Sequence, residues 1–369
     1  MPDRMHRRLG VPTGPGWDSY PEHQLACPWL AGDRRPLASV GLPLPLGAPI
    51  DIFRIKEHVS FMITYAELQR DRKSLLALTG LTLPEFALLL PAFVRSVERL
   101  YPPDRTMSGQ PRRRSAGAGR TAVLAGPEQK LLFLLVYLKA YPLHVVMAEL
   151  FGLSPSRVNY WLHRLLPVLR DARDDLGVLP ERDPQALART ATPPQGQTQR
   201  IIDGTERRRQ RPNNPEKQRA HYSGRKKTHS DKNVVVADAD SRRIDFLSQT
   251  YEGRMPDKSI ADREGIAYPP GTVLYKDSGF QGYEPAVAQT CQAKKKPPGG
   301  ELTAAEQRTN RKLGQIRVRV EHALAGVKRC RIVKDVLRST AEGVSDSAME
   351  AACGLHNLRV EKRLRRGKS

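Results

Sequence analysis

The spacing of apolar residues changes near residue 199, and this change constrains the fold more than any other feature. Between Tyr65 and Leu176 apolar side chains recur at three- and four-residue steps, which predicts helices. From Gln199 onward the sequence turns to short runs rich in Val, Ile and Thr, which predict strands. A chain of 369 residues is long enough for both parts to have a core. We therefore predict an all-α domain followed by an α/β domain.

Successive helices are expected at the end of the all-α part. Pro127 begins one helix, a short helix covers 143–150, Gly152 provides a turn, and Ser154 caps a third helix. These lengths are typical of a helix-turn-helix, although a plain corner of a helical bundle has the same shape. The outer face of the third helix carries side chains suited to a DNA groove: Arg157, Asn159, Tyr160 and Arg164.

The second part begins with strands and ends with helices. The expected strands are 199–202, 233–238, 243–250 and 272–276, with 286–291 as a weaker candidate. Thr303 starts a long helix whose core-facing stripe is Leu313, Ile316, Val320, Ala323 and Val327. A last helix is expected over 342–366. A strand, a hairpin of strands, a further strand and then a helix match the ribonuclease-H-like α/β fold.

Three acidic residues lie at positions in this order of elements where a catalytic site could form. Asp203 and Asp277 follow strand-like runs, and Glu321 lies in the long helix. In such a fold the ends of neighbouring strands lie beside a helix, so these carboxylates are expected to converge. Together they could hold two Mg²⁺ or Mn²⁺ ions about 3.5–4 Å apart, as phosphoryl displacement needs. Singly, each has a plain structural explanation: a turn for either aspartate, and an ion pair with Arg317 for the glutamate.

The charge of the chain favours a nucleic-acid partner. Lys and Arg total 61 against 39 acidic residues, for a formal net charge of +22, and the basic residues cluster. Segment 207–229, expected to be extended between strands, is strongly basic and also carries Tyr222 and His229, which could stack on an unpaired base. A solvated hairpin is the simpler alternative. The basic residues expected to contact DNA phosphates are Arg225, Lys226, Lys227, Arg317 and Lys328.

The remaining features set the boundaries and the compartment. Residues 1–61 are rich in Pro and Gly and read as a disordered or spurious leader, with Met62 as the natural start. The expected domains are 62–176 with the helix-turn-helix, a linker at 177–199, a catalytic domain at 200–340, and a C-terminal helix with a basic tail at 341–369. Four cysteines without a Cys-x-x-Cys motif indicate a reducing, intracellular setting. No apolar run reaches the ~20 residues of a membrane helix.

Several short motifs carry a family resemblance that runs from about Met62 to Val336. They are Ile202–Glu206 with Arg211-Pro212, Tyr222–His229, Gly253 with Pro256–Lys258, Lys276–Tyr283, Lys294–Pro297, Asn310-Arg311 and Arg317–His322. As a set they resemble the DDE-type transposases of bacterial insertion sequences, in the group related to eukaryotic Harbinger transposases. Family members often have His-Asp where this chain has Pro256-Asp257, so only the aspartate is expected as an accessory residue near the site.

The resemblance implies the chemistry and the partners. It implies that Asp203, Asp277 and Glu321 form a catalytic triad that binds two Mg²⁺ or Mn²⁺ ions. It implies that the helix-turn-helix recognises terminal inverted repeats in double-stranded DNA, and that the enzyme cleaves and transfers strands. A homo-oligomer would hold the two element ends, and the setting would be the bacterial cytoplasm, at the nucleoid.

Two other functions stay open at this point. A domesticated, non-catalytic DNA-binding protein would use only the helix-turn-helix and the basic surface. A structure-selective nuclease of the same fold, such as a ribonuclease H or a junction resolvase, would cut a hybrid or a four-way junction without preferring terminal repeats.

Overall fold

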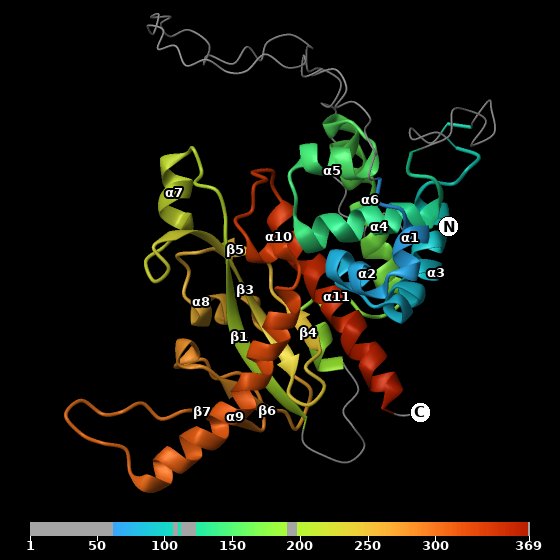
Figure 1. Cartoon of the computed structure of the whole chain (residues 1–369). Helices are drawn as coiled ribbons and strands as arrows, with labels where there is room; N and C mark the ends of the chain where they lie inside the picture. Colours follow the sequence, from blue (N-terminus) through green and yellow to red (C-terminus); the bar gives the residue numbers. More distant parts are fainter. Residues whose placement is uncertain (1–61, 106–109, 112–122, 190–197, 368–369) are drawn as a thin grey trace, which may run out of the picture. The chain divides into compact units, whose positions relative to one another are not determined.

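The computed structural model describes residues 62–105, 110–111, 123–189 and 198–367 (Figure 1). The predicted leader at 1–61 and residues 190–197 of the predicted linker lie outside the described residues. Among the described helices, no single one is long and apolar enough to cross a membrane. One pair bent by 60°, Arg72–Thr79 with Leu83–Leu100, passes that test jointly, by length and composition only.

Helices make up the first described part of the chain. They are α1 (Tyr65–Arg70), α2 (Arg72–Thr79), α3 (Leu83–Leu100), α4 (Gly126–Ala140), α5 (His144–Phe151) and α6 (Pro155–Asp175). Thr82 and Glu85 form the capping box at the start of α3, as their spacing indicates. Gly152 ends α5 with a φ of 61°, a left-handed conformation that glycine adopts without strain. Ser154 then caps α6 by accepting a hydrogen bond from the Arg157 backbone N–H.

A mixed sheet with helices forms the second part. The strands are β1 (Gln199–Arg208), β2 (Tyr222–Ser223), β3 (Thr228–Asp238), β4 (Ile244–Leu247), β5 (Tyr251–Glu252), β6 (Val273–Lys276) and β7 (Gln289–Gln292). The order is β2-β3-β1-β6-β7, with β4 and β5 paired to β3. β1 runs antiparallel to β3 and parallel to β6, and β6 runs parallel to β7. This mixed sheet confirms the predicted ribonuclease-H-like class.

Both faces of the sheet are buried, because successive side chains on a strand point to opposite faces. Ile201 and Val235 face the larger core, which also includes apolar residues of the helical part and of α9 (Ala304–Val327). Ile202 and Val234 face a smaller core with residues of α8 (Asp257–Glu264). The predicted core stripe of α9 lies in or against the larger core. The sheet is therefore sandwiched between α9 on one face and α8 on the other.

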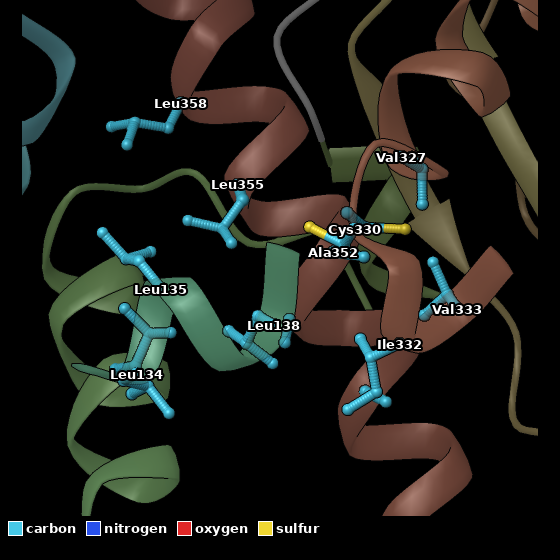
Figure 2. Close-up of a cluster of buried hydrophobic side chains, with 14 of the residues drawn as sticks. Leu134, Leu135, Leu138, Val327, Cys330, Ile332, Val333, Ala352, Leu355 and Leu358 are labelled. Atoms are coloured by element: carbon cyan, nitrogen blue, oxygen red, sulfur yellow. The ribbon is translucent and has the colours of Figure 1, made fainter. Parts of the chain in front are cut away.

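The C-terminal helices share a core with the helical part. α10 (Arg331–Lys334) contacts α4, and α11 (Val344–Arg366) contacts α3, α6 and α9. Figure 2 shows Leu138 of α4 between Leu134 of the same helix and Ile332 of α10, with Leu355 of α11 close by. Both parts of the chain therefore meet around these helices.

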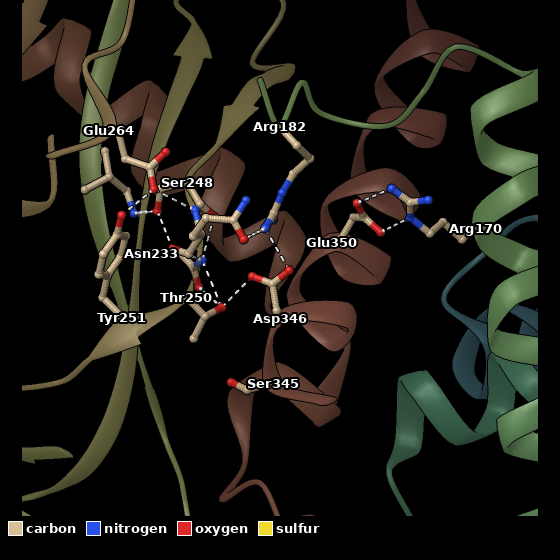
Figure 3. A network of polar contacts seen from close by, with 12 residues as sticks. Arg170, Arg182, Asn233, Ser248, Thr250, Tyr251, Glu264, Ser345, Asp346 and Glu350 are labelled. Carbon is tan, nitrogen blue, oxygen red and sulfur yellow. Dashed lines mark hydrogen bonds and ion pairs between the residues drawn. The ribbon is translucent and has the colours of Figure 1, made fainter. Parts of the chain in front are cut away.

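Polar contacts also attach α11 to both parts of the chain (Figure 3). Asp346 accepts hydrogen bonds from Arg182 and from the Thr250 hydroxyl, each at 2.7 Å. Further along the helix, Glu350 pairs with Arg170 of α6 at 2.8 Å. α11 thus connects the helical part to the segment before β1, through Arg182, and to the connection between β4 and β5, through Thr250.

The structure corrects one prediction. Segment 207–229 is not extended throughout, because it contains α7 (Pro215–His221). The Asn214 side chain caps this helix by accepting from the N–H groups of Glu216 and Lys217, with Pro215 at the first position. These two residues are ordinary helix-start signals, which the basic composition of the segment obscured.

Candidate active site

Asp203 and Asp277 come from neighbouring parallel strands and lie at the same edge of the sheet. Ile202 of β1 is opposite Lys276 of β6, so the next residue on each strand is an aspartate. Ile201 and Tyr275, two residues earlier on each strand, face the core on the α9 side. Because side chains alternate, both aspartates are directed toward the face that α9 covers. The predicted meeting of these two acids therefore follows from strand register.

Asp257 lies at the same edge and is reached from the opposite face. It is the first residue of α8, and its carboxylate lies against Gly204, which directly follows Asp203, and Gly279, which lies two residues after Asp277. A β-carbon on Gly204 would lie 2.6 Å from Asp257 Cγ, and one on Gly279 would lie 3.3 Å from its Oδ2. Both positions therefore favour glycine for space. Lys232 of β3 pairs with Asp257 at 3.2 Å.

α9 brings basic side chains to the two strand ends. Arg317 Nη2 lies 3.1 Å from Asp277 Oδ1. Lys328, the residue that ends α9, interacts electrostatically with Asp203. Glu321 lies four residues after Arg317 and seven before Lys328, so all three share one side of the helix. Glu321 is exposed there, and within the described part of the chain its carboxylate is not placed with the two aspartates to hold a metal ion.

The surroundings of Asp203 shift its pKa away from the ordinary value of an aspartate. The pKa of Asp203 is raised to about 6, mainly because the side chain is buried, with Asp277 and Asp257 adding repulsion. The Gly204 N–H, which donates to Asp203 Oδ1 at 2.8 Å, and Arg317 act in the opposite direction. A raised pKa from burial and nearby carboxylates is typical of functional sites.

The turn between β2 and β3 supplies further positive charge. Arg225, Lys226 and Lys227 are exposed in this turn, and Lys227 has a φ of 53°. Burial lowers the pKa of Lys328, and the charges of Lys226 and Arg207 lower it further. Lys226 is therefore near Lys328, and the turn lies on the side of the site that α9 occupies.

The acids of this edge have the donor chemistry that a divalent cation prefers. Carboxylate oxygens are the usual ligands of Mg²⁺, and Asp203 has no ion-pair partner among the described residues. Within the same part of the chain, no three His, Cys, Asp or Glu side chains are placed to hold a metal ion. Asp277 and Asp257 instead pair with Arg317 and Lys232. The residues fit a divalent ion in chemistry, and binding it requires Asp277 to separate from Arg317.

The predicted recognition residues lie on α6. Arg157, Asn159 and Tyr160 are exposed. Arg157 lies 5.8 Å from the Tyr160 ring centroid. Arg164 is less free, because its guanidinium stacks 3.8 Å from the Tyr101 ring and donates to the Tyr160 hydroxyl. Its contacts fix the position of Tyr160, and its predicted role in binding DNA stays a prediction.

Sequence reasoning missed the groups that hold Asp257 in place. The close approach of Gly204 and Gly279 was indicated only by their positions one and two residues after Asp203 and Asp277. Lys232 gave no local signal, because its pairing with Asp257 depends on where α8 crosses the end of the sheet.

Comparison with known protein families identifies both parts of the chain. Residues 202–357 match the family described as DDE superfamily endonuclease, and residues 123–173 match the helix-turn-helix of DDE superfamily endonuclease. The chain therefore contains a DDE superfamily endonuclease domain of the Harbinger-related group, preceded by the helix-turn-helix domain of DDE transposases. This confirms the predicted resemblance. A search of curated proteins found no match.

Proposed function

We propose that this protein is an insertion-sequence transposase that binds the terminal inverted repeats of its element and cleaves and transfers DNA strands. The observation that carries the proposal is the shared edge of β1 and β6, where Asp203 and Asp277 face a helix carrying Glu321 between two basic residues. The family supports a DNA endonuclease with a helix-turn-helix DNA-binding domain. Two element ends must be held, so the working unit is a homo-oligomer at the bacterial nucleoid.

The acidic residues of the site would bind metal ions, and the basic residues would bind DNA phosphates. Asp203, Asp277 and Glu321 would hold two Mg²⁺ or Mn²⁺ ions, which when bound polarise the scissile phosphate and activate the attacking hydroxyl. At neutral pH Asp203, with a pKa of about 6, is mostly ionised. Lys328 interacts with Asp203, and Lys226 lies near Lys328; both would attract the phosphates of the strand to be cut. Arg317 neutralises Asp277 until a cation replaces it.

Loss of a single acid tests the catalytic assignment. Asp277→Asn or Glu321→Gln should reduce metal-dependent nicking of DNA that carries the element's inverted repeats by more than about a hundredfold. Even partners of metal ligands are worth 10–100-fold, and a ligand should be worth more. Binding to the same DNA, measured without metal, should remain close to the parent value. Asp240→Asn is the matched control, because that side chain is 79 % exposed.

The outcome separates this proposal from its alternatives. A variant that nicks as fast as the parent would remove the assigned acid from the site. Absence of nicking in the parent, with repeat binding intact, would favour a non-catalytic DNA-binding protein. Cleavage of RNA–DNA hybrid or four-way junctions without a preference for the repeats would favour a structure-selective nuclease.

The sequence specificity of DNA binding by the helix-turn-helix can be tested separately. Arg157→Ala should weaken binding to inverted-repeat DNA by about 1–3 kcal/mol and leave binding to unrelated DNA nearly unchanged, if its exposed guanidinium reads a base. Titrations of both DNAs at several salt concentrations measure the difference. Equal weakening on both DNAs would make Arg157 a phosphate contact instead.

A further inference from the structure

A basic hollow with an aromatic wall lies away from the catalytic acids, beside α7 and the β2–β3 hairpin. Its volume is about 610 Å³. Its lining residues are Arg211, Gln218, Arg219, Tyr222, Gly224, His229 and Arg254. Three of these are arginines and none is acidic, so the hollow suits an anionic ligand with a flat ring.

The arginines are held by their surroundings. Arg211 donates from Nε and Nη2 to the Gln218 side-chain oxygen, at 3.0 and 2.7 Å, which orients its guanidinium. Arg254 follows Gly253, where a β-carbon would lie 2.1 Å from the Ser230 hydroxyl oxygen and 2.9 Å from the His221 carbonyl oxygen. The Arg254 N–H also donates to the carbonyl of α7 residue Ala220 at 3.1 Å. Arg254 is thereby fixed against the helix.

Two of these arginines have guanidinium groups that are available to bind an anion. Within the described part of the chain, the side chains of Arg219 and Arg254 form no ion pair and no hydrogen bond. Each can therefore bind a phosphate without giving up a partner. A guanidinium can contact a phosphate through two parallel hydrogen bonds, which favours a nucleic-acid backbone over an anion that offers a single acceptor atom.

The aromatic wall is formed across the hairpin. Tyr222 of β2 pairs with His229 of β3 in register, and their ring centroids are 5.6 Å apart at an angle of 67°. The Tyr222 residue is 42 % exposed, which leaves much of its ring open. Burial and three neighbouring basic groups lower the pKa of His229, so its ring is neutral at neutral pH. The pair therefore offers stacking surface rather than a further cation.

We propose that this hollow binds one unpaired nucleotide of the DNA strand beside the cut, with its base on Tyr222 and its flanking phosphates on Arg211, Arg219 and Arg254. The proposal rests on the proposed function, since it assigns the DNA that the site would cut. Paired bases in a duplex cannot present their faces to a side chain, whereas an unpaired base can stack on an aromatic ring whatever its identity.

The hollow is too far from the catalytic edge to hold the reacting phosphate. Asp203 is opposite Val235 on β3, and His229 lies six residues before Val235 on the same strand. At about 3.3 Å per residue this is roughly 20 Å. The bound nucleotide therefore belongs to DNA a few positions away from the cut.

Binding without metal tests the proposal apart from cleavage. The full chain should bind a duplex with a single-stranded extension at least about fivefold more tightly than the same duplex with blunt ends, because stacking one base is worth that much or more. Tyr222→Ala should abolish this preference, and Tyr222→Phe, the matched control, should retain it. Arg254→Ala should weaken binding of the extended duplex and lower its dependence on salt concentration. An extension lacking its bases is the matched ligand.

The outcomes are distinct. The proposal is overturned if the extension without bases binds as tightly as the natural one, if Tyr222→Ala keeps the preference, or if Tyr222→Ala weakens blunt and extended duplexes equally. The last result would assign the hollow to duplex backbone. Asp203→Asn should keep the preference for the extension, so a chain that cannot nick DNA can still support this assignment, and one that nicks DNA can still refute it. Circular dichroism confirms that each variant is folded.

Discussion

Buried carboxylates lie at two places along β1 and have different partners: Asp245 of β4 lies beside Arg200 at the start of β1, and Asp203 lies near its middle. Near its start, Asp245 is buried and its pKa is raised to about 6; near its middle, Asp203 is buried and its pKa is also raised to about 6. Burial is the largest cause in both cases. Asp245 lies 2.8 Å from Arg200, which also pairs with Asp238. Asp203 has no ion-pair partner among the described residues and accepts a backbone N–H from Gly204.

This difference is the one we expect between a structural acid, Asp245, and the proposed metal ligand, Asp203. At the Arg200 end the chain supplies its own buried cation, so the charges are balanced within the fold. At the Asp203 end the nearest acids, Asp277 and Asp257, add repulsion, and the balancing charge must come largely from outside. An ionised, desolvated acid without an adjacent cation lowers the stability of the fold and creates a site for a metal ion.

The largest expected effect on stability is that of removing Arg200. Arg200→Ala should lower the free energy of unfolding by about 3–5 kcal/mol at pH 7, because it removes the buried cation that Asp238 and Asp245 share and leaves only the longer 3.5 Å pair of Asp245 with Arg243. The loss should shrink toward pH 5, where Asp245 takes up a proton more readily in the folded chain than in the unfolded one. Urea unfolding at both pH values measures it.

A matched control compares an exposed pair. Arg189 pairs with Asp183 at 3.4 Å, and the arginine side chain is 74 % exposed, so Arg189→Ala should change stability by less than about 1 kcal/mol. A similarly small loss for Arg200→Ala would mean that the fold tolerates unpaired acids beside Arg200 as well as at Asp203. The contrast between them would then fail.

The next effect has the opposite sign. Without metal, Asp203→Asn should raise the free energy of unfolding at pH 7 by up to about 3 kcal/mol, since its raised pKa of about 6 measures how strongly the folded state disfavours the charge. A carboxyl whose pKa is raised on folding binds its proton more tightly in the folded state. Its contribution therefore destabilises the fold as pH rises from about 4 to about 6. The variant should lose this part of the pH dependence.

Unfolding curves with a chelator present measure the change, and adding Mg²⁺ should then stabilise the parent more than the variant. Asp240→Asn serves as the exposed control. If Asp203→Asn is less stable than the parent at pH 7, Asp203 is a structural acid like Asp245, and the proposed metal site loses its main support.

Signals that act over a few residues predicted much of the fold. The cap at Thr303, the turn at Gly152 and the α9 stripe were predicted from their neighbours, and α9 begins directly after Thr303. The strand predicted at 272–276 is β6. These elements depend on capping, backbone freedom and periodicity, all of which can be read within one or two turns of chain.

The candidate site was predictable only in part, for a physical reason. Asp203 and Asp277 were expected together because each follows a strand and a family resemblance supplied the strand order. The partners of these acids depend on register and on how helices cross the sheet, which no short segment records. Lys232 beside Asp257, and Arg200 between two acids, are contacts of this kind. The catalytic roles of Asp203, Asp277 and Glu321 remain predictions that the variants above test.

The smallest expected effect is that of Arg317→Ala, which can be compared directly with Arg200→Ala because each variant removes an arginine paired with an acid. Arg317 pairs with Asp277 at 3.1 Å, but both side chains are partly exposed, at 25 % and 34 %. Arg317→Ala should therefore lower the free energy of unfolding by no more than about 1 kcal/mol, against the several expected for Arg200→Ala. Arg317 also holds the pKa of Asp203 down, so its loss should move the pH window of Asp203 upward. Arg317→Lys, which keeps the charge, should leave that window nearly in place. A loss as large as that of Arg200→Ala would mean that Arg317 balances the acids as part of the fold, and the edge would then have little need for a metal ion.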